Sequence, residues 1–459
     1  MSAASPVESR LRSTIRVLRK SPAALWIAFV LVHLLLGFQG LTEAGGPLGD
    51  IYSVYEYWAK AADHQAVYYG IDKPWVYPIV ALVPMILAGI FGFAHYTGAF
   101  LGLVFLFDLI AFAALVGWRR PNRPIDAAWW WIGFLLFLGP IALGRIDSIS
   151  VPVAIVGTVF VASRPRLAAV LLTVATWIKV WPAAMIAAIV IASRARIRVL
   201  LTVIVTSAVI VAAALALGAG SNVFSFVSQQ TSRTLQIESP TGTIWMWMAF
   251  AHVPGAFPYY NETLNTFEVA GPGSLQAAAL LTPLLAIVML VVVILGIVAV
   301  QRGSVVTELL PPLALALVSA FIAFNKVVSP QYITWLAVPL LLGLVTNSLG
   351  RGKPFRFPAT VGLMIAALTQ IYYPVLYVDL YALHPLELVV VSMRNILVLV
   401  LFVWAVVQLA GLIRPFAAHE VLAESDSDAW LPAVWPFAPR FAQSDEATTH
   451  PRTEEDHST

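Results

Sequence analysis

One carboxylate in the chain lies among aromatic residues directly after an apolar segment. Asp50 follows a turn rich in glycine and proline at residues 45–49, and it precedes Tyr52, Tyr55 and Trp58. Aromatic rings stack on sugar faces and favour the boundary between a membrane and water. A carboxylate beside them can remove a proton from a sugar hydroxyl. The stretch predicts a sugar-binding site with Asp50 as its base; the structural alternative is an aspartate that caps an interfacial helix.

Further polar side chains recur beside apolar segments later in the chain. A charge at the centre of a membrane helix costs about 2.5–3.5 kcal/mol, so charges near such helices usually mark a polar path or site. We expect these residues on the same side of a membrane as Asp50. The set consists of Arg145, Asp147, Lys179, Gln229, Arg233, Gln236, Glu238, Lys326, Gln331 and Tyr332.

This mixture fits a substrate whose leaving group is a phosphate carried by a lipid. Arginine binds phosphate oxygens through paired hydrogen bonds, and lysine supplies a compact charge. Lys179, Arg233 and Lys326 are the predicted phosphate ligands, and one displacement with inversion needs no nucleophilic cysteine or serine. The predicted contacts to sugar or acceptor are Tyr52, Tyr55, Trp58, Arg145, Asp147, Gln236, Glu238, Gln331 and Tyr332.

Each charged member of the set also has a structural explanation. Arg145 and Asp147 could pair with other charges. Arg233 and Glu238 could lie on a solvated loop, and Lys326 could extend its stem along a helix to reach the membrane surface.

The composition determines what kind of scaffold must position these residues. Of the 459 residues, 60% are hydrophobic and 11% are charged, whereas a soluble domain carries about 25% charged residues. The chain is therefore predicted to be a polytopic membrane protein, and its 15 Trp and 14 Tyr suit interfacial belts. The net charge of +3 comes from short basic clusters between apolar runs, which orient membrane helices and do not indicate nucleic-acid binding. Cysteine is absent, which excludes disulfides and thiolate metal sites.

Basic residues give the expected orientation of the segments. Residues 1–22 carry five Arg or Lys and are predicted to be cytoplasmic, so the span at 23–41 leads to an external loop at 42–98. The apolar run 77–93 is predicted to dip into the membrane without crossing it. If it crossed, three arginines between residues 118 and 123 would lie outside. A second external loop is predicted at 218–274.

The segment 167–193 has basic residues on both sides, so it must cross an even number of times. It is too short for two spans of about 20 residues each. A hairpin of short helices is therefore predicted, with its turn at residues 179–182. Irregular backbone at membrane depth is tolerated where it lines a cavity or is buried in protein, which makes Lys179 a candidate site residue on this ground as well.

The predicted fold is an all-α membrane bundle of about 12 transmembrane helices, with interfacial helices in the first external loop. The transmembrane domain is placed at residues 23–415. Asp108 and His33 lie within spans and are predicted to be structural. The other spans are predicted at 101–117, 127–143, 149–162, 199–217, 275–300, 309–324, 333–345, 359–376 and 386–412.

The tail at 416–459 is acidic and rich in Ser and Thr, and it is predicted to be disordered and cytoplasmic. It contains Asp426 and Asp428 in a D-x-D pattern, which in a disordered segment on the cytoplasmic side is not assigned a metal. No His, Asp and Glu cluster has a metal-ligand spacing. No cofactor is predicted, and dependence on a divalent metal is left open.

Five stretches in this order resemble a known family. They are Leu48-Gly49-Asp50, Tyr77-Pro78, Lys179-Val180-Trp181-Pro182, the segment 233–239 and the segment 326–332. Together they resemble the C-type membrane glycosyltransferases, and more narrowly the actinobacterial α-mannosyltransferases of glycosyltransferase family 87, which use polyprenyl-phosphate mannose. The family often has Tyr-Pro-Pro where this chain has Tyr77-Pro78-Ile79.

The resemblance implies that Asp50 is the catalytic base and that mannose is transferred with inversion from polyprenyl-phosphate mannose. The implied acceptor is a mannosylated phospholipid or lipoglycan, and the implied linkage is α-1,2. The implied location is a multi-pass position in the plasma membrane among its lipids, with the active site on the external face. Two alternatives remain open from the sequence: a flippase or transporter of lipid-linked sugars, and a transferase of another lipid-phosphate sugar such as arabinose.

Overall fold

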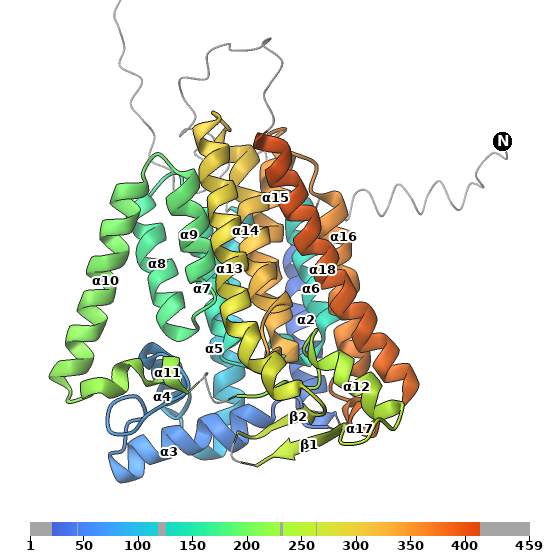
Figure 1. Cartoon of the computed structure of the whole chain (residues 1–459). Coiled ribbons are helices and arrows are strands. Elements are labelled where there is room, and N and C mark those ends of the chain that lie inside the picture. The colour runs from blue at the N-terminus through green and yellow to red at the C-terminus, as the bar shows by residue number, and fades with distance from the viewer. Residues whose placement is uncertain (1–20, 44, 118–124, 230–232, 263, 414–459) are drawn as a thin grey trace, which may run out of the picture.

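The computed structural model of the chain describes residues 21–43, 45–117, 125–229, 233–262 and 264–413. Helices run up and down between two ends of the molecule (Figure 1). The structure confirms the predicted all-α membrane fold. Within the described ranges the sheet consists of one antiparallel hairpin, β1 (Phe257–Asn261) and β2 (Thr266–Ala270), which lies at one end of the bundle. We call this the hairpin end.

In the part of the chain that the structure describes, six helices are long and apolar enough to cross a membrane, because each contains an 18-residue window of high mean hydropathy with few charges. A full crossing needs about 20 residues. These six helices are α2 (Pro22–Thr42), α5 (Tyr96–Val116), α10 (Arg196–Ala216), α13 (Ser274–Gln301), α14 (Val306–Ala323) and α18 (Pro385–Ile413).

Shorter helices complete the bundle. The described residues contain six long apolar helices where the sequence predicts about 12 transmembrane helices, and each of the shorter ones falls below a full crossing of about 20 residues. They are α6 (Ile125–Leu138), α7 (Asp147–Val159), α8 (Pro165–Ile178), α9 (Ala183–Ala192), α15 (Ala337–Ser348) and α16 (Arg356–Tyr372).

Helix α14 forms the centre of the bundle, with 78% of its apolar window buried by the protein itself. It packs against α18, α9, α13 and α15. By contrast, only 11% of the window of α10 and 17% of that of α13 are buried. Apolar residues that the protein does not cover are stable only in contact with lipid, so α10 and α13 form the outer faces of the bundle.

The predicted helix break at residues 179–182 is confirmed. Helix α8 ends at Ile178 because Lys179 adopts an extended backbone, and α9 begins directly after Pro182. A proline suits the start of a helix because it lacks an N–H and its φ is already helical. Helices α8 and α9 form a helical hairpin. Its turn stops well short of the end of the molecule where β1 and β2 lie (Figure 1).

The run predicted to dip without crossing forms only a single 3-10 turn, η2 (Ile79–Ala81), and the seven-residue helix α4 (Leu82–Ala88). Neither is long enough to span a bilayer. Helix α5 then begins at Tyr96, five residues before the start predicted from hydropathy. The difference arises because the helix begins with polar and small residues, which a prediction based on apolar runs leaves out.

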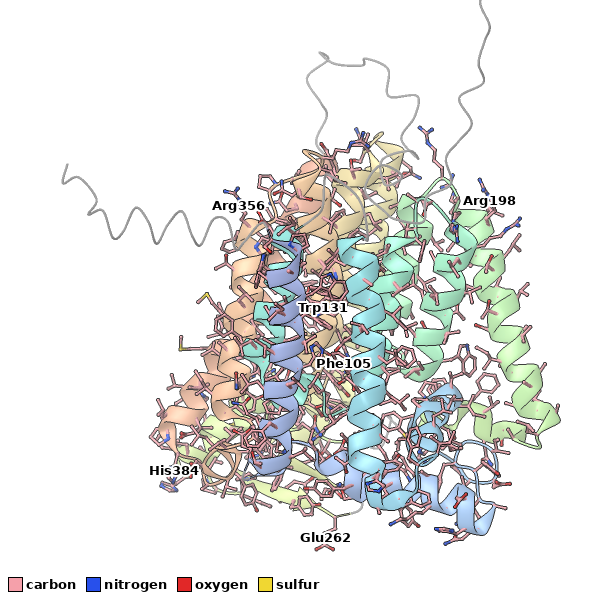
Figure 2. The ribbon with its side chains drawn as sticks, turned by 180° about the vertical axis from the view of Figure 1, so that it is seen from behind. Phe105, Trp131, Arg198, Glu262, Arg356 and His384 are labelled. Carbon is pink, nitrogen blue, oxygen red and sulfur yellow. The ribbon has the colours of Figure 1, made fainter. Side chains whose placement is uncertain are left out.

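Each end of the bundle carries its own charged or titratable residues, which distinguish the two ends. Arg198 and Arg356 lie at one end, and Glu262 and His384 lie at the other (Figure 2). Short elements gather at the hairpin end: the π-helix η1 (Asp50–Tyr55), α3 (Glu56–Gln65), α11 (Ser225–Ser228), α12 (Gly242–Phe250), α17 (Tyr377–Tyr381) and the 3-10 segments η4 (Pro140–Ala142), η5 (Gly220–Phe224) and η6 (Pro330–Leu336).

His33 and Asp108 join α2 to α5 in the interior. The Nε2 atom of His33 lies 3.0 Å from Oδ2 of Asp108, and its Nδ1 is 2.9 Å from the carbonyl oxygen of Phe29. Both side chains are buried. A buried charge is tolerated when it is paired, so this pair fixes α2, which leads directly to the turn that carries Asp50.

Candidate active site

A cavity of about 1040 Å³ opens at the hairpin end. It brings together side chains from η1, the turn before α7, the α8–α9 break, the segment 233–238, β2, η6 and α17. Sequence positions more than 300 residues apart therefore share one site. The predicted site residues that line it are Asp50, Trp58, Arg145, Lys179, Arg233, Gln236, Glu238, Lys326, Gln331 and Tyr332.

Asp50 is the first residue of η1. The turn before it needs glycine, because Gly46 has φ +58° and a Cβ there would lie 2.7 Å from the hydroxyl of Tyr52. Oδ2 of Asp50 forms an ion pair with Nε of Arg145 at 3.1 Å, and the Asp50 side chain keeps 29% of its surface exposed. The carboxylate is thus held in one place and remains open to the cavity.

Arg145 holds the turn that carries Asp50. Its Nη1 donates to the carbonyl oxygens of Pro47 at 2.7 Å and Gly144 at 2.9 Å, and its Nη2 donates to the hydroxyl of Tyr373 at 2.9 Å. The two backbones approach so closely that a Cβ on Gly144 would lie 2.7 Å from the oxygen of Pro47. The structure therefore gives this arginine a positioning role as well as a place on the cavity wall.

Asp147 is fully buried and does not line the cavity. Its Oδ2 lies 3.4 Å from Nζ of Lys179, and its Oδ1 accepts a hydrogen bond of 2.6 Å from Nε1 of Trp335. Lys179 lies between two rings, with Nζ 4.6 Å from the centre of the Tyr77 ring and 5.5 Å from that of Tyr332. Cation–π contacts of this kind fix the direction of an ammonium group.

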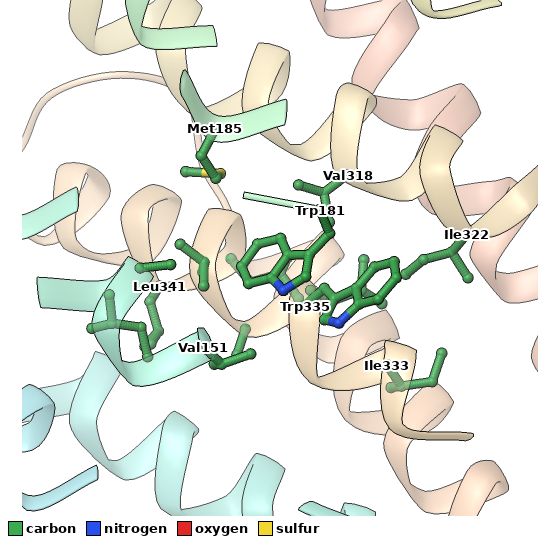
Figure 3. Close-up of a cluster of buried hydrophobic side chains, with 14 of the residues drawn as sticks. Val151, Trp181, Met185, Val318, Ile322, Ile333, Trp335 and Leu341 are labelled. Carbon is green, nitrogen blue, oxygen red and sulfur yellow. The ribbon is translucent and has the colours of Figure 1, made fainter. Parts of the chain in front are cut away.

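Packing of two tryptophans secures the α8–α9 break. The rings of Trp181 and Trp335 are stacked, with centroids 5.8 Å apart and planes 10° apart. Figure 3 shows the two rings within a cluster of aliphatic side chains that includes Val151 and Ile322. Trp335 also stacks on Tyr332, with centroids 4.0 Å apart. The aromatic wall of the cavity is therefore continuous with the core.

Arg233 and Lys326 lie on adjoining segments. The backbone N–H of Gln236 donates to the carbonyl oxygen of Lys326 at 3.0 Å, and the N–H of Thr234 donates to Oε1 of Glu268 on β2. Burial and then the positive charge of Arg233 lower the pKa of Lys326. Two like charges this close indicate a place suited to an anion.

The cations surround one tyrosine. The charges of Lys179 and Arg233 both act on the hydroxyl of Tyr332, whose side chain lines the cavity. Lys179, Arg233 and Lys326 thus form a cationic part of the cavity lining, in which the charge of Arg233 acts on both Lys326 and Tyr332. We call this the cation wall.

Glu238 lies on another wall with Tyr377, whose hydroxyl donates a hydrogen bond of 2.5 Å to its Oε1. Burial raises the pKa of Glu238 to about 7, although the hydrogen bond from Tyr377 and the charge of Arg394 on α18 oppose the rise. The carbonyl oxygen of Glu238 accepts a hydrogen bond from Nη2 of Arg394 at 3.0 Å.

Two other predicted sugar contacts do not reach the cavity wall. Tyr52 points to the outside, with 53% of its surface exposed. Tyr55 is completely buried, and its hydroxyl accepts a hydrogen bond of 3.1 Å from the N–H of Ile146. Tyr55 therefore joins η1 to the turn before α7, and the ring-rich stretch that drew attention in the sequence serves in part as packing.

Sequence reasoning missed several residues of the site. Tyr373 and Tyr377 line the cavity, while Glu268 and Arg394 support residues that do. A signal was available for Arg394, because an arginine within a predicted span usually has a buried partner. Glu268 gave no signal, since it lies in a long stretch that sequence alone shows only as an external loop.

A metal site is not indicated in the part of the chain that the structure describes, where no three His, Asp or Glu side chains gather in a way that could hold an ion. Asp426 and Asp428 lie outside the described residues.

The family comparison agrees with the resemblance in the motifs. The model of Glycosyltransferase family 87 matches residues 75–265. The matched residues make up less than half of the chain, and over them the chain is similar to this glycosyltransferase family. The match includes Lys179, Arg233 and Glu238, whereas Asp50 and Lys326 lie outside the matched residues. No curated protein and no solved structure matches the chain.

Proposed function

We propose, with the similarity to glycosyltransferase family 87 as the premise, that this chain transfers mannose from polyprenyl-phosphate mannose to a mannosylated phospholipid or lipoglycan. Transfer occurs with inversion and forms an α-1,2 linkage. The observation that carries the proposal is the cavity that joins Asp50 to Lys179, Arg233 and Lys326.

The cation wall suits the phosphate of the donor. Lys326 and Arg233 lie close enough for the charge of one to lower the pKa of the other, and a phosphate between them would relieve that repulsion. Lys179 is held in place by Asp147 and by two rings, so it reaches the phosphate without further ordering. Charge-assisted hydrogen bonds of this kind are among the strongest in proteins.

An apolar part of the same cavity suits the lipid chain. It is lined by Leu281 and Leu285 of α13 and by Phe226 and Val227 of α11. Helix α13 is one of the least covered in the bundle, so this wall lies beside the bilayer. The polyprenyl chain would enter sideways while its phosphate reaches the cation wall.

Asp50 is the base in this mechanism. The acceptor oxygen forms a bond to the anomeric carbon of mannose as the bond from that carbon to the phosphate oxygen breaks, and the acceptor proton passes to the Asp50 carboxylate. Polyprenyl phosphate leaves with the bonding electrons, and the cation wall stabilises its charge. Arg145 holds the carboxylate in place through an ion pair and leaves it open to the cavity.

The remaining lining residues supply sugar contacts. Trp58 and Tyr332 offer ring faces, and Gln236 and Gln331 offer amides. Part of the hydrogen-bonding capacity of Gln236 is already used, because its Nε2 donates to the hydroxyl of Thr266 at 2.6 Å. Arg145 and Glu238 also border this space.

The site is proposed to face the outside of the plasma membrane. Arg198 and Arg356 lie at the opposite end from the cavity, with other arginines on the same connections (Figure 2). Short loops rich in Arg and Lys remain on the cytoplasmic side, which leaves the hairpin end external.

The test is transfer by the purified chain in detergent. Radiolabelled polyprenyl-phosphate mannose is incubated with a panel of mannosyl lipids, and the product linkage is determined. Product formation without a membrane gradient supports an enzyme, because a flippase or transporter has no such activity in detergent. Transfer from polyprenyl-phosphate arabinose in place of mannose would overturn the donor assignment, and failure with every donor would overturn the function.

A further inference from the structure

Glu238 faces a part of the cavity that the cation wall does not occupy. It is 2% exposed and lines the cavity beside Tyr373 and Tyr377. Within the described ranges, only Oε1 accepts a hydrogen bond, which the hydroxyl of Tyr377 donates. Oε2 is buried and has no hydrogen-bond partner among the described residues. Buried polar atoms nearly always have a partner, so an unpartnered carboxyl oxygen at a cavity wall indicates that a ligand supplies one.

The elements around Glu238 are arranged to keep it in place. Arg394 and Asn395 of α18 both donate to its backbone carbonyl oxygen. The guanidinium of Arg394 is directed by the hydroxyl of Tyr372, to which its Nη2 donates at 2.8 Å. The backbone of Glu238 is therefore rigid, and its side chain is the part that remains to meet a ligand.

We propose that Glu238 is the hydroxyl-binding group for the acceptor sugar, with its ionised Oε2 accepting a hydrogen bond from a ring hydroxyl. The inference rests on the proposed function, and it adds which substrate this carboxylate binds and how a proton controls that binding.

The acceptor is favoured over the donor because of charge. The donor carries a phosphate, which a carboxylate repels and the cation wall attracts. Asp50, the group that must meet the acceptor hydroxyl, lines the same cavity as Glu238. The charges of Asp50, Arg145 and Glu238 all act on the hydroxyl of Tyr373, so this tyrosine lies near both carboxylates.

The proton on Glu238 then sets acceptor affinity. The ionised form accepts charge-assisted hydrogen bonds, which are about twice as strong as neutral ones, and burial raises the pKa of Glu238 to about 7. The titratable and charged groups that face it are Tyr377 of α17, Tyr372 and Tyr373 at the end of α16, and Arg394 of α18. Helix α12 brings none. Among these groups, Glu238 is the one whose pKa is placed near 7.

The experiment measures the acceptor KM and the donor KM separately between pH 6 and pH 8. Octyl α-mannoside serves as the acceptor and polyprenyl-phosphate mannose as the donor. If only the ionised form binds, the acceptor KM rises about tenfold from pH 8 to pH 6. The donor KM should not change with pH over this range.

Glu238→Gln should show a high acceptor KM that no longer depends on pH. Glu387→Gln, which changes a buried carboxyl of α18 that does not line the cavity, is the matched control.

Binding without turnover separates this inference from the proposed function. Octyl α-mannoside is titrated into Asp50→Asn, with tryptophan fluorescence as the signal. Binding that weakens toward pH 6 and loses this dependence in Asp50→Asn/Glu238→Gln supports the acceptor site even if no donor is ever transferred. The inference is overturned if the mannoside does not bind, if its affinity is flat over this pH range, or if the double variant binds like Asp50→Asn. A change in the donor KM alone would also overturn it.

Discussion

Nε of Arg145 lies 3.1 Å from Oδ2 of Asp50, and the same guanidinium also donates to Pro47, three residues before that aspartate. One side chain therefore fixes both the position of the carboxylate and the turn that carries it. This relationship makes the site sensitive to changes that do not touch a substrate.

Asp50→Asn should retain the fold and lose transfer. A positioned general base contributes about 10²- to 10⁴-fold, so kcat should fall by at least a hundredfold while the donor KM changes little. The measurement is initial-rate kinetics, with gel filtration to confirm folding. Asp63→Asn is the matched control, because Asp63 lies on the exposed surface of α3. Activity of Asp50→Asn close to that of the original chain would remove Asp50 from the mechanism.

Arg145→Met should lower both stability and kcat. It leaves the carbonyl oxygen of Pro47 without its donor and Asp50 without its counter-charge, and each buried group left unpaired costs about 1–3 kcal/mol. Tyr373→Phe removes only the hydroxyl that accepts from Arg145 and should have a smaller effect. Thermal unfolding in detergent and kcat report the two effects. Equal effects of the two variants would contradict the positioning role.

Arg233→Ala and Lys326→Ala should each raise the donor KM. The loss of a hydrogen bond to a charged group costs about 1.5–3 kcal/mol, or roughly 10- to 100-fold in affinity. The measurement is donor KM at saturating acceptor. Arg198→Ala provides the control, since this arginine lies exposed at the opposite end (Figure 2). An unchanged donor KM in both site variants would place the phosphate elsewhere.

Asp147→Leu should destabilise the chain more than it affects any contact with substrate, because it leaves Lys179 buried without its anion. Breaking one partner of a buried ion pair costs about 3–5 kcal/mol. The double variant Asp147→Leu/Lys179→Met should recover much of that loss while remaining inactive toward the donor. Thermal unfolding of the two variants tests this, and equal unfolding midpoints would show that Lys179 does not need its partner.

Glu238→Gln should stabilise the fold at high pH. The folded pKa of about 7 lies above the ordinary glutamate value of 4.5, so the native state binds the proton more tightly than the unfolded chain does. Stability from this group is complete below pH 4.5 and falls as the pH rises toward 7. The amide stays neutral, so the variant should gain up to about 3 kcal/mol relative to the original chain above pH 7. A midpoint difference that is constant from pH 5 to pH 8 would contradict this.

The sequence predicted those features that depend on length and charge. The break at Lys179 followed from basic residues on both sides of a segment too short for two spans, and the structure contains it. The grouping of Asp50, Arg233 and Lys326 followed from their place beside spans. The cavity joins all three.

The partners of those residues could not be predicted. The pair of Asp50 and Arg145 depends on how two turns nearly 100 residues apart meet, and the hydrophobic pattern of the spans carries no information about this. Tyr55 shows the same limit. Its ring was expected at the sugar, but in the structure its hydroxyl bonds to Ile146 within the core.

The short α8–α9 hairpin has a consequence for the bilayer. Helix α8, with 14 residues, is about 21 Å long and α9, with 10 residues, about 15 Å, whereas the hydrocarbon core measures about 30 Å. A hairpin of this length that starts at the membrane surface turns inside the lipid layer, so under the proposed function the reacting carbon would be reached without lifting the isoprenoid out of its leaflet. Turnover should therefore vary with acyl-chain length, since a thicker membrane would draw the sugar headgroup away from the depth at which Lys179 is fixed.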